Sequence, residues 1–419
     1  MSLRRAPRRV LIIVENLPAP FDRRVWAEAT TLARAGHVVS IICPMMKGYD
    51  AEFEQIDGVA IYRHPLHEAG AEGEYLREYA GALYHQLRLA LRVRRERGFD
   101  VIHACNPPDL IFLVAGLFKA LFGVRFIFDH HDLCPELFEA KFGRRGLRWR
   151  LLLALERLTF ALADVSIATN ESYRDIAIHR GGMKPDRVFI ARSGPRLDKI
   201  LLRDANPALK KNGARFLIGY VGVIGRQEGL DLLVDAAAHL VNVIGRKDAH
   251  FAIIGDGPEL DTVKAHAAAL GVADYFSFLG RVDDATFLET LSTADLCVNA
   301  DRWCALNDKS TMNKILEYMA LAKPIVQFDL VEGRRSAGAA SFYAKKDDSA
   351  DFARQIETLL RDEALRVAMG KIGRERVVRE LSWAHSEPAL LAAYDRAFAQ
   401  KTGEPAAVAA SQERKVAAP

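Results

Sequence analysis

The sequence predicts an α/β protein with two doubly wound parallel sheets, and three observations support this fold class. Short β-branched and apolar runs alternate with helical periodicity along the chain. The alternation restarts after a polar, turn-rich stretch at residues 196–213, which is typical of a linker. At 419 residues the chain also exceeds one ordinary hydrophobic core. We therefore expect two Rossmann-like domains that face each other across a ligand cleft.

The first domain is expected to span residues 1–200. Its buried apolar runs predict strands at 10–14, 38–43, 59–63, 101–104, 125–128, 165–169 and 188–190. Helical periodicity predicts helices at 24–35, 75–97, 110–121, 147–163 and 171–180. Asp22 is the expected N-cap of the first helix because a short polar side chain stands just before the periodic pattern.

The second domain is expected to span residues 213–381. Strands are predicted at 216–221, 250–254, 275–279, 296–299, from Ile325 onward, and at 341–343. Helices are predicted at 230–240, 260–270, 285–292, after Thr311, and at 350–361 and 363–377. One more helix is expected at 388–398, and the Ala-rich tail at 400–419 is expected to be disordered.

Composition is that of a globular protein, with 50% hydrophobic and 27% charged residues and a net charge of +4. Residues 1–200 hold 30 Lys and Arg against 24 Asp and Glu, with arginine clusters at 88–97 and 144–150 beside apolar helical sequence. These clusters are either solvated helix faces or a surface that rests on anionic lipid. Nucleic acid is not expected as a partner, because the charge balance is mild and no reader motif is present.

The five cysteines include no Cys-x-x-Cys pair, which fits reduced thiols in a cytoplasmic protein. The basic start has no small-residue cleavage site, so a secretory signal is not expected. The longest apolar run, at 110–121, is far shorter than the roughly 20 residues of a membrane span. We expect a cytoplasmic location, with peripheral attachment to the inner face of the membrane as an option.

Residues 307–329 are the most informative stretch of the chain, since they combine a polar run, a periodic helix and the start of a buried strand. Ser310 or Thr311 is the expected N-cap, and Lys314 and Glu317 share one helix face. A helix N-terminus attracts phosphate, and a carboxylate one turn further accepts from ribose hydroxyls. The alternative is a surface helix with an ordinary ion pair between these two residues.

Glycines follow the first strand of the second domain, in the sequence GYVGVIGRQEG at 219–229. Gly222 and Gly225 would let the backbone approach a phosphate, which Arg226 would neutralise. Gly255 ends the next strand, where a structural turn is as good an interpretation as a ligand loop. The Gly-x-Gly-x-x-Gly spacing and the acidic residue that a dinucleotide ribose requires are missing, which argues against an oxidoreductase.

A cluster of ionisable residues, Asp129, His130, His131 and Asp132, follows the predicted strand at 125–128. Ligand-facing groups belong at the carboxyl end of such a strand. A metal site is not expected, because adjacent histidines point in different directions on an extended chain, and satisfied structural histidines are the other alternative. The sequence contains no Asp-x-Asp, so a metal-bridged diphosphate is not indicated and no cofactor is expected.

Further polar residues follow other strands of the first domain and converge on the same rim. The candidates for ligand contact in the first domain are Asn16, Phe21, Arg23, Arg24, Asn106 and Asp132. Each alone is more often a capping or turn residue, but their convergence favours ligand contact.

Together these motifs resemble the retaining GT-B glycosyltransferases of family 4 over nearly the whole chain. Matching pieces include ENLPAPFDRRVWAEATTLARAGHVVSIICP, FDHHDLCPE, GYVGVIGRQEGLDLL and STMNKILEYMALAKPIV, in the family's order. The resemblance implies an acceptor in the first domain and a nucleotide-sugar donor in the second. It also implies that a last helix, within 382–399, packs back on the first domain.

By this resemblance Glu317 binds the donor ribose and His131 contacts the donor sugar. Lys309 stands where the family has its first signature glutamate, a role that could pass to Asp308. Val223 and Glu228 occupy the positions of the usual arginine and lysine on the glycine turn. STMNK is similar to a variant found in bacterial surface-polysaccharide transferases.

The prediction is a retaining, metal-independent transferase that moves a sugar from a UDP- or GDP-sugar to a glycan or polyprenyl-linked acceptor in surface-polysaccharide synthesis. His131, Arg226 and Lys314 are the expected catalytic residues. The expected donor-binding residues are Glu317, Gly222, Gly225, Asp308, Lys309, Ser310, Thr311, Met312, Asn313 and Gly255. The alternatives are a GT-B sugar-nucleotide epimerase and a non-catalytic, nucleotide-sugar-binding subunit.

Overall fold

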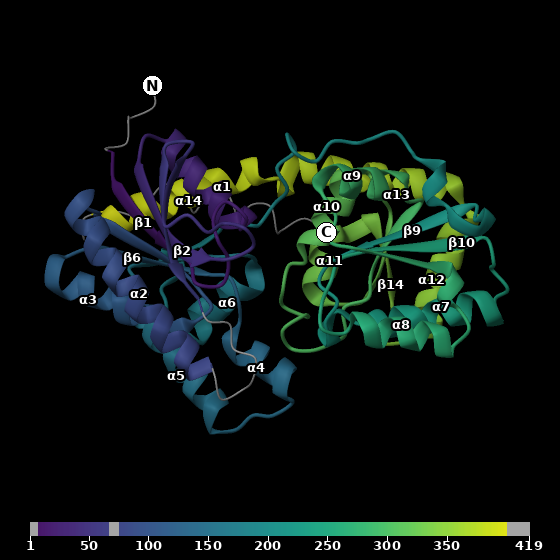
Figure 1. Cartoon of the computed structure of the whole chain (residues 1–419), viewed down its shortest axis with the longest axis horizontal. Helices are drawn as coiled ribbons and strands as arrows, with labels where there is room; N and C mark the ends of the chain where they lie inside the picture. Colours follow the sequence, from purple (N-terminus) through teal and green to yellow (C-terminus); the bar gives the residue numbers. More distant parts are fainter. Residues whose placement is uncertain (1–6, 67–74, 400–419) are drawn as a thin grey trace. The chain divides into compact units, whose positions relative to one another are not determined.

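The structure is a computed structural model that describes residues 7–66 and 75–399, and the chain forms two compact α/β units (Figure 1). Unit 1 contains the residues before Ser193 together with those from Ser386 onward. Unit 2 contains Ser193–His385. The tail at 400–419, which was expected to be disordered, lies outside the described residues.

Unit 1 is built on an eight-stranded sheet with the order β3-β4-β2-β1-β5-β6-β7-β8. The strands are β1 (Arg9–Ile13), β2 (Val38–Met45), β3 (Phe53–Ile56), β4 (Val59–Pro65), β5 (Val101–Cys105), β6 (Arg125–His130), β7 (Val165–Ala168) and β8 (Val188–Ile190). All neighbours are parallel except β3, which runs antiparallel to β4. Only β3 was not predicted, because FEQI is a short polar edge strand without an apolar run.

The helices of unit 1 are α1 (Arg23–Arg34), α2 (Tyr75–Glu96), α3 (Phe112–Phe122), α4 (Cys134–Phe142), α5 (Leu147–Leu162), α6 (Glu171–His179) and most of α14 (Trp383–Phe398). The predicted cap of α1 is confirmed, since the Asp22 carboxylate accepts from the amides of Arg24 and Val25. Helix α4 was not predicted, because the residue at its N-cap, Leu133, provides no side-chain cap.

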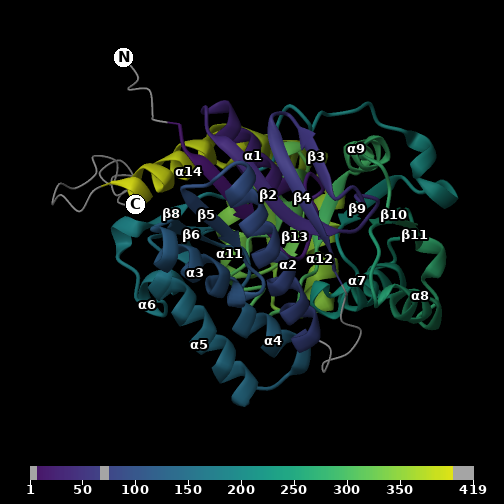
Figure 2. The ribbon, with the colours of Figure 1, turned by 60° about the vertical axis from the view of Figure 1, so that its left-hand side comes forward.

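Helix α14 completes unit 1 from the far end of the chain. The Tyr394 hydroxyl lies 2.8 Å from Nδ1 of His103 on β5. Thr31 of α1 donates to the Glu387 carboxylate at 3.1 Å, and Arg34 forms an ion pair with the same carboxylate. Both views place α1 and α14 side by side (Figures 1 and 2).

Unit 2 is built on a fully parallel six-stranded sheet with the order β11-β10-β9-β12-β13-β14. Its strands are β9 (Phe216–Val221), β10 (Ala249–Ile254), β11 (Phe276–Gly280), β12 (Leu296–Asn299), β13 (Ile325–Phe328) and β14 (Ser341–Ala344). The strand order reverses direction between β9 and β12, as it does between β1 and β5 in unit 1. Ligands of open α/β sheets bind at the carboxyl ends of strands at such points.

The helices of unit 2 are α7 (Leu230–Ala238), α8 (Leu260–Ala269), α9 (Asp284–Thr293), α10 (Asn313–Ala320), α11 (Val331–Ala337), α12 (Ser349–Arg361) and α13 (Glu363–Arg376). The short α11 was not predicted. The predicted N-cap of α10 is wrong: the helix begins at Asn313 after Met312, and the Ser310 hydroxyl bonds back to the Leu306 carbonyl.

Among the described residues, none of the helices has the length and apolar character needed to traverse a bilayer. All five cysteines are free thiols, and four of them are buried.

Candidate functional site

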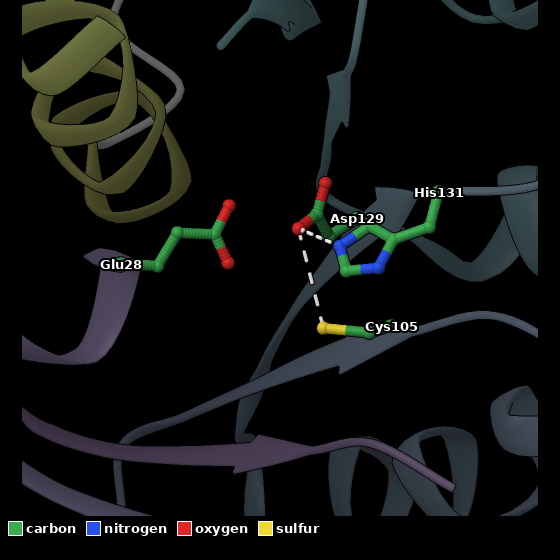
Figure 3. A group of neighbouring side chains, drawn as sticks. All are labelled: Glu28, Cys105, Asp129 and His131. Carbon is green, nitrogen blue, oxygen red and sulfur yellow. Dashed lines mark hydrogen bonds and ion pairs between the residues drawn. The ribbon is translucent and has the colours of Figure 1, made fainter. Parts of the chain in front are cut away.

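A buried ion cluster lies at the carboxyl ends of β5 and β6 in unit 1. Glu28 on α1, Cys105 on β5, Asp129 on β6 and His131 beyond β6 point toward one another (Figure 3). Arg24 joins them: its Nη2 lies 2.7 Å from Asp129 Oδ1 and 3.2 Å from Glu28 Oε1. Nε2 of His131 lies 2.5 Å from Asp129 Oδ2. The sequence brings these groups together because parallel strands end at one edge of the sheet.

The two carboxyl groups of this cluster differ in protonation. Burial and the nearby Asp129 raise the pKa of Glu28 well above its usual range. Burial alone would also raise the pKa of Asp129, but Arg24 and His131 hold it well below the usual range. Asp129 is therefore the ionised member. Nε2 of His131 is contacted both by this carboxylate and by Nε of Arg24 at 3.0 Å, and together they hold the ring in one orientation.

These four side chains have the right atom types for a metal ion, with ligand atoms that all lie within 4.8 Å of one another. A cation already stands among them, because the guanidinium of Arg24 is paired with both Asp129 and Glu28. A metal ion in this place would face that positive charge, so the group fits an internal ion cluster better than a metal site.

Asn106 positions the loop that carries His131. Its Oδ1 accepts from the amides of His131 at 2.7 Å and Asp132 at 3.1 Å. Its Nδ2 donates to the Asp132 carbonyl at 2.7 Å and to Asp109 at 2.9 Å. The side chain of Asn106 is buried, and that of Arg24 is only 7% exposed. Both side chains bind other parts of the protein, and contact of Asn106 and Arg24 with an acceptor stays a prediction.

His130 is a structural residue, as the alternative interpretation of the His-His pair allowed. Its ring is fully buried and packs against Phe160 and Tyr173, with centroids 5.2 Å and 5.0 Å away. Burial, with a contribution from Arg180, lowers its pKa to about 3. His131 differs, because its side chain remains 12% exposed.

The other acceptor-side candidates of unit 1 lie nearer the surface. Phe21 is 42% exposed and packs against Tyr49, with Lys47 over its ring at 5.3 Å. Arg23 is exposed, and Asn16 and Asp132 are half-buried. Oδ1 of Asn16 is buried and has no hydrogen-bond partner. These four residues stay candidates for ligand contact.

In unit 2 the glycine turn after β9 lies against a lysine. A Cβ at Gly222 would meet the Tyr220 hydroxyl at 2.8 Å and Nζ of Lys314 at 3.5 Å. A Cβ at Gly225 would meet the Glu228 carboxylate at 2.7 Å. Glycine at position 222 therefore keeps the backbone close to the Lys314 ammonium, as phosphate binding requires, whereas the neighbour at position 225 is a carboxylate.

Gly255 packs against the glycine turn, and its contact with the donor stays a prediction. A Cβ there would lie 1.8 Å from the Gly222 carbonyl oxygen, and the Gly255 amide donates to Gly280. Gly255 thus allows two turns to pack together, which agrees with its interpretation as a structural turn.

The predicted lysine of α10 is held by an aspartate. Nζ of Lys314 lies 2.8 Å from Asp301 Oδ1, and the lysine and aspartate side chains are 10% and 2% exposed. Burial would lower the pKa of Lys314, but Asp301 and Tyr220 raise it above its usual range. The alternative interpretation was an ion pair between Lys314 and Glu317, but the ion pair that Lys314 forms is with Asp301. Glu317 itself is half-buried one turn further along α10.

The remaining donor-side candidates surround this pair within unit 2. Arg226 is exposed and makes no hydrogen bond or ion pair within the described part of the chain. Asp308 accepts from the Val331 amide at 3.1 Å and lies 3.6 Å from Lys346, so it ties down the start of α11. Lys309, Ser310, Thr311 and Met312 are half-buried and Asn313 is exposed, and together they form the entry to α10.

Three charged or titratable residues of these clusters were missed at the level of sequence: Glu28, His103 and Asp301. Glu28 stands four residues after Arg24 on α1, a spacing that indicates an ion pair. Asp301 follows β12 by two residues, so its position after a strand was a signal. His103 lies inside β5, where nothing in the sequence distinguishes it from a core residue.

Comparisons with known proteins agree with this architecture. Residues 22–198 match the family model "Glycosyltransferase Family 4", and residues 215–362 match "Glycosyl transferases group 1". The chain is 26% identical over 321 residues to 2-deoxystreptamine glucosyltransferase of Streptomyces kanamyceticus, covering 74% of this chain and 81% of that one. It is 22% identical over 385 residues to the capsular polysaccharide biosynthesis glycosyltransferase CapM of Staphylococcus aureus, covering 82% and 91%.

Among solved structures, sucrose-phosphate synthase of Thermosynechococcus elongatus matches with a TM-score of 0.79 at 18% identity, covering 93% of this chain and 99% of that one. At this identity the match establishes the fold, which is GT-B. The matches favour a transferase over the epimerase and the non-catalytic subunit. Both units are matched by glycosyltransferase models, and the chain belongs to the family 4 glycosyltransferases and is a glycosyltransferase.

Proposed function

We propose that this glycosyltransferase is a retaining, metal-independent enzyme that takes a sugar from a UDP- or GDP-sugar. Its acceptor would be a glycan or polyprenyl-linked glycan in bacterial surface-polysaccharide synthesis. The similarity to CapM, which is named for capsular polysaccharide biosynthesis, supports this acceptor class. A lipid-linked acceptor would bring the enzyme to a membrane surface.

The observation that carries the proposal is the Lys314 ammonium beside the glycine turn. Asp301 holds it in place at 2.8 Å, next to Gly222 and at the entry to α10. An ammonium, a glycine turn and a helix N-terminus in one place suit a diphosphate. Arg226, which is exposed, would add a second positive charge. Together they would stabilise the charge that develops on the departing diphosphate, in place of a metal ion.

The proposed transfer breaks the bond between the anomeric carbon and the diphosphate oxygen, and a bond from the acceptor oxygen forms on the same face of the sugar. The acceptor proton passes to the leaving phosphate oxygen, so no side-chain base is required. By the family resemblance, Glu317 would bind the ribose and His131 the donor sugar. Asp129 and Arg24 would keep the ring of His131 in one orientation.

Donor affinity of the full chain tests this proposal. Isothermal titration with UDP- and GDP-sugars should show binding, and Glu317→Ala should weaken it about tenfold or more, since a charged hydrogen bond is lost. Glu375→Ala, an exposed glutamate on α13, is the matched control and should bind as the parent does. Unchanged affinity in Glu317→Ala would refute the site.

The reaction itself has separate readouts. NMR of the product should show the anomeric configuration of the donor, and turnover should persist in EDTA. An inverted product, or activity that returns only with a divalent cation, would overturn the proposed mechanism without touching the family assignment.

A further inference from the structure

Helices α2, α3 and α5 form one layer of unit 1 and carry a concentration of exposed apolar side chains. Helix α3 contacts both α2 and α5, and both views place the three side by side (Figures 1 and 2). A Cβ at Gly116 on α3 would lie 3.4 Å from Leu162 on α5. Nine of the 22 exposed large hydrophobic side chains of the described residues lie on these three helices. A concentration of this kind marks an interaction surface.

The exposed side chains follow helical spacing, so they form stripes. They are Tyr84 and Leu91 on α2, Leu113, Leu117, Leu121 and Phe122 on α3, and Leu147, Leu151 and Leu158 on α5. The three α3 leucines are four residues apart and 41–64% exposed. Leu147, at the start of α5, is 84% exposed. We call this surface the leucine–arginine face, because exposed arginines of α2 and α5 alternate along the helices with these apolar side chains.

The charge of this face is positive. Arg88 and Arg95 on α2 and Arg150 and Arg157 on α5 are exposed, and none of the four has an ion pair with any described residue. The carboxylates of the same helices do not compensate them. Glu156 of α5 is buried, Glu96 of α2 is paired with Arg92 at 2.8 Å, and Glu78 lies in the first turn of α2, ten residues before Arg88. Helix α3 contains no acidic residue.

A shallow groove runs along α5 between two of these arginines. Its volume is about 550 Å³, and it is lined by Arg150, Leu153, Ala154, Arg157, Leu158 and Ala161. Apart from the two guanidinium groups its walls are apolar. This combination suits an amphiphile with a phosphate head and a hydrocarbon body, because arginine binds phosphate and leucine binds acyl chains.

We propose that the leucine–arginine face binds a bilayer that contains anionic phospholipid, with the leucines at the boundary between headgroups and acyl chains. Charge complementarity favours this occupant over a second copy of the chain. In a symmetric dimer through this face the unpaired arginines of both copies would approach one another, and like charges at close range repel. The proposal depends only on this surface and would hold even if the acceptor were a soluble molecule. It can therefore be disproved without disproving the proposed transfer reaction.

Vesicle co-sedimentation of the full chain, without donor or acceptor, tests the inference. Binding is expected to vesicles of phosphatidylcholine with one third phosphatidylglycerol, to weaken as salt rises, and to be much weaker with phosphatidylcholine alone. Arg150→Gln/Arg157→Gln should reduce partitioning roughly 25-fold, at about fivefold for each arginine near an anionic surface. Leu151→Ser/Leu158→Ser should reduce it about tenfold, because apolar area no longer enters the interface.

The matched control carries equivalent changes on unit 2. Val367 is 66% exposed and Lys247 is exposed, so Val367→Ser/Lys247→Gln removes one apolar and one charged group from the other unit and should bind like the parent. Circular dichroism melting of each variant verifies that it is folded. Absent binding to anionic vesicles, or folded α5 variants that bind like the control, would overturn the proposal. The proposal would also be overturned if light scattering showed that the parent protein is a dimer and that Leu151→Ser/Leu158→Ser is a monomer.

Discussion

The carboxyl ends of the two sheets use charge in different ways. In unit 1 the charged groups are buried and compensate one another, as in the cluster of Arg24, Glu28 and Asp129. In unit 2 one buried pair, Lys314 with Asp301, lies beside a glycine turn whose Arg226 is exposed. We infer from this difference that the charged residues of unit 1 mainly stabilise its fold, because each residue of the cluster depends on the others. In unit 2 the positive charge beside the glycine turn can still bind a ligand.

The largest effect is expected where the compensation in unit 1 is broken. Asp129→Ala leaves the buried guanidinium of Arg24 without its main partner, which should cost about 3–5 kcal/mol of unfolding free energy. Urea unfolding measures the loss, and hydrogen exchange with mass spectrometry should locate it in peptides of unit 1. A cost below about 1 kcal/mol would mean that water reaches the cluster and that the comparison fails.

Breaking the pair in unit 2 should separate stability from binding. Lys314→Met leaves Asp301 as an unpaired buried carboxylate and should cost roughly 2–3 kcal/mol, together with most of the donor affinity. Lys314→Met/Asp301→Leu should recover most of the stability, since neither charge remains, but none of the affinity. Titration with a UDP- or GDP-sugar decides: a double variant that binds like the parent would show that the ammonium has no role in donor binding.

Glu15 should give unit 1 a pH dependence. It follows β1, is 3% exposed, and its Oε1 has no hydrogen-bond partner. Burial, with a contribution from Glu78, raises its pKa to about 8 from 4.5. The pKa of Glu15 is higher in the folded than in the unfolded protein. The free energy of unfolding is therefore unaffected by Glu15 below pH 4.5 and falls as pH rises toward 8. Glu15→Gln should remove roughly 2–3 kcal/mol of this loss.

Thermal melting between pH 5 and 9 measures the effect of that substitution. The parent should lose stability across this range more steeply than Glu15→Gln, and the two curves should converge near pH 5. Parallel curves would mean that the Glu15 carboxyl group is ionised in the folded protein and that solvent stabilises its charge.

The smallest effect on the fold is expected at Arg226. Because its side chain is exposed and unpaired among the described residues, Arg226→Gln should change stability by less than about 0.5 kcal/mol. Donor affinity should fall about five- to tenfold, the value of one charge-assisted hydrogen bond to phosphate. Equal affinities of parent and variant would place the diphosphate away from the glycine turn.

The elements of the fold follow well from sequence because apolar periodicity is local. Every predicted strand and helix is found, with ends shifted by a few residues, and the omissions are short elements with weak signals. The strand β3 is polar, α4 begins without a side-chain cap, and α11 has only seven residues. The N-cap of α10 was mispredicted for a different reason. The Ser310 hydroxyl donates a hydrogen bond to the Leu306 carbonyl, four residues earlier in the chain.

The candidate site was predictable only in part, because its pairings join residues far apart in sequence. Arg226 belongs to the glycine turn by sequence, and the family resemblance placed Lys314 beside it. Nothing local revealed that Arg24 is held by Asp129, 105 residues away, and so it was taken for a ligand contact. The same holds for Asn106, whose bonds to residues 131 and 132 exist only once β5 and β6 pair.

The return of α14 makes unit 1 discontinuous in the gene. Tyr394 and Glu387 supply contacts to His103 and α1 that no residue before Ser193 replaces. During synthesis, unit 1 therefore waits for its closing helix until all of unit 2 has left the ribosome. A laboratory fragment of the first half should likewise be expressed with residues 386–399 joined to it through a short linker.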